Sequence, residues 1–432
     1  MNTGSILILL PLLIIFSYLF DLIAKRTKFP SVILLMITGI IARTVANKYG
    51  FDNTVLLNSL IPVLGTIGLI LIVMEGALEL DIRREKLGLI FSGFLAALII
   101  LILNIILLKF FFTTILKIPN DPAILYAIPL SIISSAVVIP SASGLLARDK
   151  EFVIYESTFS DILGIVIFNY SIQQIELNEP LVSASPIMEL GIQILGIVFL
   201  SLIITYFLAR LIQSIDHHVK FFLILALLIL VYAVGKSFHF PSLLTIFIFG
   251  IFLSNGGRNR DFELLPNFMT RSIDIEKTKK SLDEFHVLTS ESTFLVRTFF
   301  FLFFGFSITL DSFISPEPYF YAISVLLIMY GARHLYLSFS TFNFNTTPLV
   351  YMSPRGLISI LLFLQLGTLD DPNLKTNVID ERVLLLVILI SMLVMLLGTL
   401  KKPEVKENIS LEIKTPIDEE IDPDYSNEQI NN

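Results

Sequence analysis

The sequence predicts an all-α membrane protein with about thirteen transmembrane helices. Of its 432 residues, 55% are hydrophobic and only 16% are charged, whereas soluble domains carry nearer a quarter charged residues. Uninterrupted apolar runs of about twenty residues recur along the chain, and a helix of that length spans a bilayer. The mean hydropathy of +0.82 agrees with both observations. A soluble domain is therefore excluded.

These apolar segments divide residues 1–400 and are separated by polar loops. The first segment lacks the basic stretch and small-residue cleavage site of a signal peptide, so we expect it to be retained. The eighth and ninth segments are short, and whether they merge is left open. The predicted spans are 4–24, 30–47, 55–80, 88–113, 121–147, 151–175, 187–211, 219–235, 240–255, 292–314, 318–342, 347–367 and 381–400.

Basic residues alternate between the loops and predict an orientation. The odd-numbered loops up to the ninth are basic, as in Arg83, Arg84 and Lys86 of the third and Arg148 and Lys150 of the fifth. The intervening loops contain one basic residue or none. Because cytoplasmic loops are enriched in Lys and Arg, we expect the N-terminus outside and the C-terminus in the cytoplasm of a bacterial-type inner membrane.

Two segments are predicted to lie outside the membrane. Residues 256–291 form a charged cytoplasmic loop, in which 272–289 is compatible with an amphipathic helix. Residues 401–432 are acidic and poor in aromatic residues, which is typical of a disordered tail. The chain contains no cysteine, so disulfides and thiolate metal sites are excluded, and we expect no cofactor.

Two predicted helices contain proline where a membrane helix should be continuous. Pro129 and Pro140 fall in the fifth span, and Pro354-Arg355-Gly356 lies in the middle of the twelfth. Proline lacks an N–H donor and clashes with the preceding turn, so both helices should unwind and expose carbonyl groups. The two spans are counterparts if six helices, a linking helix and six more form an inverted repeat. In such transporters the ion site lies where the helices are broken.

The sixth span contains a carboxylate near the middle of the membrane. Asp161 lies about nine residues into it, roughly 13 Å deep. Ser157 and Ser160 flank it on one helix face. With Ser134 and the carbonyls of the broken fifth helix, these oxygens suit a hard monovalent cation, and we expect no other metal. Burial favours the neutral acid, so a cation and a proton would compete for the one group.

Four further charged residues fall within membrane spans. Since a buried charge is tolerated mainly when paired, we expect Glu156 and Arg333 to form an ion pair with Glu75 close by. Arg355 completes this predicted charge network. An interfacial position remains an alternative for Glu156, which lies about one turn from the end of its span.

Four motifs together resemble the monovalent cation/proton antiporter superfamily, and within it the NhaP-like sodium/proton exchangers. They are Val73-Met74-Glu75-Gly76-Ala77-Leu78-Glu79-Leu80, Glu156-Ser157-Thr158-Phe159-Ser160-Asp161, Phe304-Gly305-Phe306-Ser307-Ile308 and Arg355-Gly356-Leu357-Ile358-Ser359. The resemblance covers residues 1–400. It implies the inverted-repeat antiporter fold with crossed broken helices, a dimer-forming domain, a mobile core domain and an elevator-like motion.

The chain departs from this family at two positions. Ser160 stands where the family usually has Asn, and Ser134-Ser135-Ala136 stands where it has Thr-Asp-Pro and resembles the Ser-Ser-Thr of its potassium-efflux branch. A single titrating carboxylate favours one-for-one, electroneutral exchange.

The function that we expect is exchange of Na⁺ or Li⁺ for H⁺, serving pH homeostasis, by a homodimer with no nucleic-acid partner. A K⁺/H⁺ exchanger or gated potassium-efflux protein is the alternative, and a non-transporting sensor or scaffold is a more remote one. An intramembrane enzyme is disfavoured, because no catalytic pair of side chains falls at matching depths in the spans.

Overall fold

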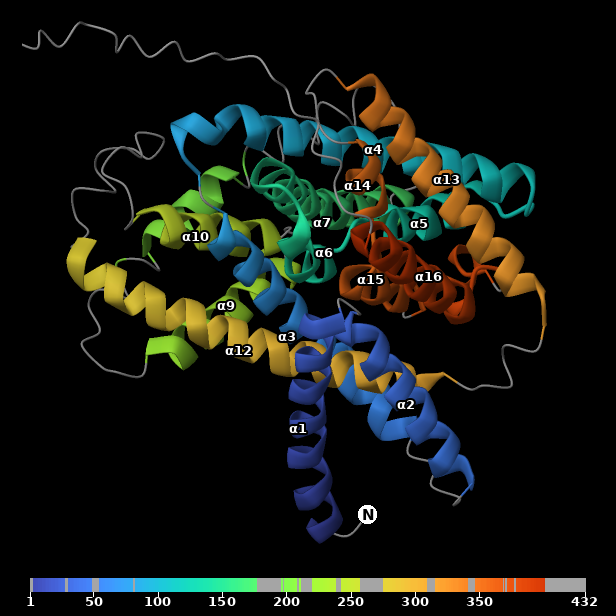
Figure 1. Cartoon of the computed structure of the whole chain (residues 1–432), viewed down its shortest axis with the longest axis horizontal. Coiled ribbons are helices and arrows are strands. Elements are labelled where there is room, and N and C mark those ends of the chain that lie inside the picture. Colours follow the sequence, from blue (N-terminus) through green and yellow to red (C-terminus); the bar gives the residue numbers. More distant parts are fainter. Residues whose placement is uncertain are drawn as a thin grey trace, which may run out of the picture. The chain divides into compact units, whose positions relative to one another are not determined.

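In the computed structural model of the chain, every secondary-structure element among the described residues is a helix (Figure 1). These are 3–27, 30–48, 54–80, 82–176, 198–207, 220–237, 242–256, 275–308, 315–340, 346–367, 371–376 and 378–400, together with 196, 210 and 369. The expected acidic tail, 401–432, lies outside the described residues, as does most of the predicted seventh span.

Each of the predicted spans overlaps a helix, which confirms the all-α membrane fold. Among the described residues, 6 helices are long and apolar enough to cross a membrane, and shorter apolar helices or charged ones account for the other spans. The helices are α1 (Thr3–Thr27), α2 (Ser31–Lys48), α3 (Thr54–Glu79), η1 (Arg84–Lys86), α4 (Leu87–Thr114), α5 (Asn120–Ser131), α6 (Ser135–Ser141), η2 (Ala142–Gly144), α7 (Ala147–Glu176), α9 (Lys220–Ser237), α10 (Ser242–Gly256), α12 (Ile275–Ser307), α13 (Glu317–Phe339), α14 (Thr346–Tyr351), α15 (Leu357–Gly367), η4 (Pro372–Leu374) and α16 (Glu381–Leu400).

The fifth and twelfth spans are both broken, as their prolines predict. In the fifth, residues 132–134 are non-helical between α5 and α6, with Ile132 and Ser134 in extended conformation; in the twelfth, 352–356 are non-helical between α14 and α15. The role of the prolines differs between the two. Pro354 lies inside its unwound segment, whereas Pro129 and Pro140 lie inside α5 and α6, on either side of the break. Interactions with the rest of the bundle therefore decide where the fifth span unwinds.

Two further boundaries are defined by the structure. The eighth and ninth spans are separate helices, α9 and α10. The amphipathic helix expected at 272–289 within the loop 256–291 is present from Ile275, and it continues without a break into the tenth span as one helix of 33 residues, α12, which ends at Ser307. Its membrane-length apolar part already begins at Phe285.

The helices from Met1 to Lys401 form one compact unit in which two groups of helices can be distinguished. In the first group α12 packs along α2 and α3, and α1, α9 and α10 attach to these helices. In the second, α4 packs along α5, α7 and α13, and α13 also contacts α14 and α16. Helix α3 connects the groups through its contacts with α6, α7 and α15 (Figure 1).

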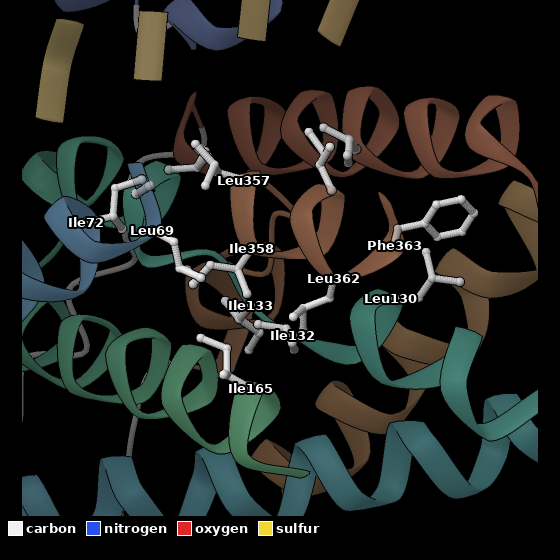
Figure 2. Close-up of a cluster of buried hydrophobic side chains, with 14 of the residues drawn as sticks. Leu69, Ile72, Leu130, Ile132, Ile133, Ile165, Leu357, Ile358, Leu362 and Phe363 are labelled. Atoms are coloured by element: carbon white, nitrogen blue, oxygen red, sulfur yellow. The ribbon is translucent and has the colours of Figure 1, made fainter. Parts of the chain in front are cut away.

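Apolar side chains surround the two broken helices and keep water from the unwound backbone. Figure 2 shows Ile132 and Ile133 of the first break beside Ile358 of α15, with Ile165 of α7 below them. All four are at least nine-tenths buried. Gly164 of α7 leaves the space that Ile132 occupies, since a Cβ at this position would overlap the Ile132 side chain. Unpaired backbone groups in such a dry environment need protein partners.

Candidate ion-binding site

The two unwound segments cross in direct contact. The backbone N–H of Ser134 donates to the carbonyl of Pro354 at 3.0 Å, which joins the break of the fifth span to that of the twelfth. Gly356 makes the crossing possible, because a Cβ there would collide with the side chain of Ser134. The motif Pro354-Arg355-Gly356 therefore contributes in two ways. It forms the non-helical segment of the twelfth span, and the missing side chain of Gly356 leaves room for Ser134 of the other segment.

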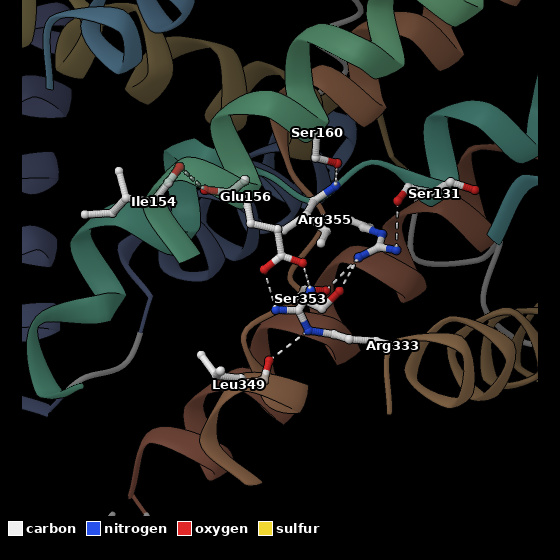
Figure 3. Close-up of polar contacts among 10 residues, drawn as sticks. Ser131, Ile154, Glu156, Ser160, Arg333, Leu349, Ser353 and Arg355 are labelled. Carbon is white, nitrogen blue, oxygen red and sulfur yellow. Dashed lines mark hydrogen bonds and ion pairs between the residues drawn. The ribbon is translucent and has the colours of Figure 1, made fainter. Parts of the chain in front are cut away.

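Arg355 binds the carbonyl groups that the first break leaves without partners. Its Nε donates to Leu130 at 2.6 Å and its Nη2 to Ser131 at 3.2 Å, the last two residues of α5. Its Nη1 donates to the carbonyl and the Oγ of Ser353, both at 2.8 Å (Figure 3). A helix C-terminus carries a partial negative charge, which stabilises a cation there. The predicted role of Arg355 in a charge network thus takes a different form, since its hydrogen-bond partners among the described residues are carbonyl and hydroxyl oxygens.

Asp161 of α7 lies against the start of α6 with one oxygen bound. Its Oδ2 accepts hydrogen bonds from the backbone N–H of Ser135 at 3.1 Å and from the Ser135 hydroxyl at 2.5 Å. Its Oδ1 is buried and has no hydrogen-bond partner among the described residues. The side chain is 3% exposed. A buried carboxylate oxygen without a partner is costly, so this atom is available to a proton or a cation.

The serines predicted to surround Asp161 have different roles in the structure. Ser160 Oγ accepts a hydrogen bond from the backbone N–H of Ile133 at 3.0 Å and so fixes the unwound segment (Figure 3). Ser134 is at the crossing itself. Ser157 is buried on the same helix but donates to the carbonyl of Ile154, one turn earlier in α7, at 3.2 Å. The structure thus brings Asp161, Ser160 and Ser134 together at the break, with Ser157 bonded within its own helix.

Ser135 is the direct partner of Asp161, and it is absent from the predicted site residues. A signal for it exists in the sequence, where Ser134 and Ser135 are adjacent within the proline-flanked segment. Choosing between neighbouring serines requires the point at which the helix resumes. Because α6 begins at Ser135, this residue presents both its N–H and its hydroxyl to Asp161.

The predicted ion pair between Glu156 and Arg333 is present and fully buried. Arg333 Nη2 donates to Glu156 Oε2 at 2.8 Å, and Nη1 contacts Oε1, so that the pairing is bidentate. The side chains of Arg333 and Glu156 are 0% and 1% exposed, so Glu156 lies inside the bundle and not on its surface. Arg333 Nε also donates to the carbonyl of Leu349 in α14 at 2.8 Å (Figure 3). The pair therefore ties α7 to α13 and to the broken twelfth span.

Glu75 does not join this pair, which corrects the expectation from the sequence. Its partners in the described residues are on α12, where Ser290 hydrogen-bonds to it and Arg297 attracts it electrostatically. Arg297 Nη1 in turn donates to the carbonyl of Ala136 in α6 at 3.3 Å. Glu75 is therefore part of a second polar group, between the two groups of helices, and the sequence reasoning missed Arg297.

Two broken helices that cross inside a helical bundle, with a buried carboxylate at the crossing, define the class of secondary transporters with discontinuous helices. The family model described as sodium/hydrogen exchanger, transmembrane, matches residues 12–405. The chain belongs to this family, and it is therefore a transporter-family protein rather than an enzyme. The resemblance to sodium/proton exchangers that the motifs indicate is confirmed.

Solved structures agree on the fold. The chain is similar to the sodium proton antiporter MjNhaP1 from Methanocaldococcus jannaschii at pH 8, with 20% identity, a TM-score of 0.66 and coverage of 93% of this chain and 96% of that chain. An electron-microscopy map of the same antiporter gives 20% identity, a TM-score of 0.66 and coverage of 93% and 95%. No curated protein sequence matches the chain.

Proposed function

We propose that this protein exchanges Na⁺ or Li⁺ for H⁺ and that Asp161 is the group on which the two ions compete. The observation that carries the proposal is the asymmetry of its carboxylate. Oδ2 is held by Ser135 while Oδ1 is buried without a partner among the described residues. Either a proton on Oδ1 or a cation beside it would remove the free-energy cost of leaving this buried oxygen without a partner. The carboxylate cannot bind both at once, so the two ions compete.

The surrounding groups hold this carboxylate in place. Ser160 holds the backbone N–H of Ile133 inside the unwound segment 132–134, and Arg355 holds the end of α5 just before it. The Glu156–Arg333 pair ties α7 to α13 with its charges already matched. The binding step thus exchanges one proton for one monovalent cation, which makes the proposed cycle electroneutral.

In the proposed transport cycle, alternating access results from a movement of one group of helices relative to the other. The site lies on α5, α6, α7 and α15, whereas α12 with α2 and α3 forms the other group. We infer that the first set moves relative to the second in an elevator-like manner, exposing Asp161 to either side. A homodimer in a bacterial-type inner membrane, with the C-terminus in the cytoplasm, completes the proposal.

Potassium exchange or efflux is the second candidate, and one observation favours it. Ser135 presents a hydroxyl to Asp161, at the position where the exchangers that the motif resembles have a carboxylate. A site with one carboxylate attracts a cation less strongly than a site with two, so it offsets less of the free energy that the cation loses when it sheds its water. This reduces the advantage of the more strongly hydrated Na⁺ over K⁺.

The decisive experiment uses purified protein in proteoliposomes with an internal pH dye, challenged in turn with Na⁺, Li⁺ and K⁺. Competition predicts that lowering the pH on both sides raises the apparent KM for the cation and leaves the maximal rate nearly unchanged. A KM that is independent of pH would contradict competition at Asp161. A response to K⁺ alone would select the second candidate.

A further inference from the structure

A cavity away from the candidate ion-binding site lies where the chain enters α4. Its volume is about 420 Å³, and it is lined by Glu85, Lys86, Gly88, Leu89, Ser92 and Arg148. One wall is η1 with the first turns of α4, and the other is the first turn of α7. Ligand pockets commonly measure roughly 300–1,000 Å³, so this cavity is large enough for a headgroup.

The cavity brings together cations from the two helix starts that form its walls. Lys86 ends η1 just before α4, Arg148 lies in the first turn of α7, and Glu85 is the one acidic residue in the lining. Lys86 also pairs with Glu151 at 2.9 Å, and both side chains remain partly exposed, at 25% and 37%. Arginine presents five donors in a planar fork and can bind a phosphate while keeping other contacts.

Apolar side chains that remain exposed flank these charges. Leu87 and Phe91 of α4 are 42% and 60% exposed, and Leu146, just before α7, is 43% exposed. Leu87 and Phe91 are each adjacent in sequence to a residue that lines the cavity, and Leu146 is two residues from Arg148. A small soluble anion would not contact these apolar side chains. A phospholipid could bind both groups, because it carries a phosphate and acyl chains on one molecule.

We propose that this cavity binds the headgroup phosphate of an anionic phospholipid, with Lys86 and Arg148 as its charged ligands. Leu87, Phe91 and Leu146 would then contact the acyl chains. Basic pockets between membrane helices bind anionic headgroups, and both helix starts belong to the basic, predicted cytoplasmic face.

The proposed lipid would bridge α4 and α7, and α7 carries Asp161 of the candidate ion-binding site. Ser92 lines the cavity, and the next residue, Gly93, packs directly on α7. A Cβ at Gly93 would lie 2.8 Å from the Cβ of Tyr155 and 3.2 Å from the backbone nitrogen of Glu156. A headgroup in the cavity is therefore about one helical turn from the contact that positions the buried ion pair.

The test compares full-length variants in detergent by native mass spectrometry and thermal unfolding, with phosphatidylglycerol or phosphatidylcholine of the same acyl chains. Arg148→Gln removes one charged ligand. Gly88→Phe fills the cavity instead, and nothing lies within 4 Å of the position of its Cβ, so the backbone need not move. Matched controls are Arg84→Gln, an exposed cation outside the lining, and Gly331→Phe on α13, where a Cβ also has no neighbour within 4 Å.

We expect wild type to bind and be stabilised by phosphatidylglycerol but not by phosphatidylcholine. Arg148→Gln and Gly88→Phe should each weaken phosphatidylglycerol binding about tenfold, and the two controls should stay within about twofold of wild type. If Arg148→Gln fails to fold, the comparison of Gly88→Phe with Gly331→Phe decides alone.

Three results would overturn the proposal. Equal binding of both lipids would show that charge is not recognised, and unchanged phosphatidylglycerol binding by Gly88→Phe would place the lipid elsewhere. The third is displacement of the lipid by an equal concentration of inorganic phosphate, which would mean that the cavity holds a small anion and no lipid.

Discussion

Arg355 donates from Nε to the carbonyl of Leu130 over 2.6 Å, although the two residues are 225 positions apart in the chain. This contact joins the unwound part of the twelfth span to the end of α5. Backbone carbonyls at a break inside a membrane protein have neither helical partners nor bulk water. One arginine supplies the donors for two of them and so allows the fifth span to be interrupted beside Asp161.

The Arg355 contact predicts that lysine cannot replace this residue. An ammonium group can donate three hydrogen bonds from one point but lacks the fork that reaches Leu130, Ser131 and Ser353. We expect Arg355→Lys to lose about 1.5–3 kcal/mol for each charge-assisted bond that it fails to make. Thermal unfolding should show a lowered Tm, and exchange in proteoliposomes should be lost.

Arg382→Lys is the matched control, because Arg382 pairs with Asp380 while both side chains stay partly exposed, at 36% and 27%. We expect an effect of at most about 1 kcal/mol there. Equal effects of the two substitutions would show that the carbonyl contacts of Arg355 carry no special weight.

Asp161→Asn should abolish exchange and leave the protein folded. The amide oxygen can still accept the hydrogen bonds from Ser135, but the group neither titrates nor carries a charge for the cation. Removing an uncompensated buried carboxylate also lifts a desolvation cost, so Tm should hold or rise.

The measurement is dye-reported exchange together with thermal unfolding of the same preparation. Asp121→Asn, at an exposed carboxylate in the first turn of α5, should retain wild-type exchange. Normal transport by Asp161→Asn would refute the assignment of this residue.

The Glu156–Arg333 pair should act chiefly on stability. Arg333→Ala leaves Glu156 buried and unpaired, which costs about 3–5 kcal/mol. The double variant Glu156→Gln with Arg333→Ala should recover much of that loss, and the two single effects should not add. Chemical or thermal unfolding of all four proteins completes the cycle; additive losses would argue against energetic coupling across the pair.

Ser135→Ala separates the two hydrogen bonds that Ser135 makes to Asp161. The backbone N–H remains, while the hydroxyl contact is lost, at a cost of about 0.5–1.5 kcal/mol, or more if a buried acceptor is left unsatisfied. We expect Asp161 to be held less firmly, with a several-fold change in cation KM and little change in Tm. An unaltered KM across Na⁺, Li⁺ and K⁺ would mean that this hydroxyl does not shape the site.

Ser160 tests the electroneutral mechanism. Asn at this position keeps an acceptor for the N–H of Ile133, so Ser160→Asn should preserve exchange. Ser160→Asp places a second acid beside Asp161, and exchange would become voltage-sensitive if more than one proton then moves per cation. Exchange under an imposed potassium-diffusion potential, followed with a membrane-potential dye, distinguishes these cases. A wild-type rate that follows the voltage would contradict one-for-one exchange.

The features that depend on local composition were predicted correctly from the sequence. Apolar length identified the spans, and proline within two of them indicated the breaks. Asp161, Glu156 and Arg333 were recognised because a charge inside a membrane span is costly and needs a reason. The predicted pairing of Glu156 with Arg333 was correct because so few opposite charges lie at that depth.

Other contacts could not be derived in this way, because they join segments that only the fold brings together. Glu75 was expected beside Glu156 and instead faces Ser290 and Arg297, which lie in a helix whose first part was predicted to belong to the cytoplasmic loop 256–291. Nothing in the local sequence around Glu75 specifies which helix lies opposite it.

By itself, then, the sequence determined an all-helical membrane protein of the exchanger type, its interrupted helices and its central carboxylate, since hydropathy and the cost of buried charge act residue by residue. Only the tertiary structure decided that Ser135 holds Asp161 and that Arg355 binds the free carbonyls of α5. Both contacts depend on where one unwound segment crosses another. That crossing is set by packing and by the room that Gly356 leaves, which are properties of the assembled bundle.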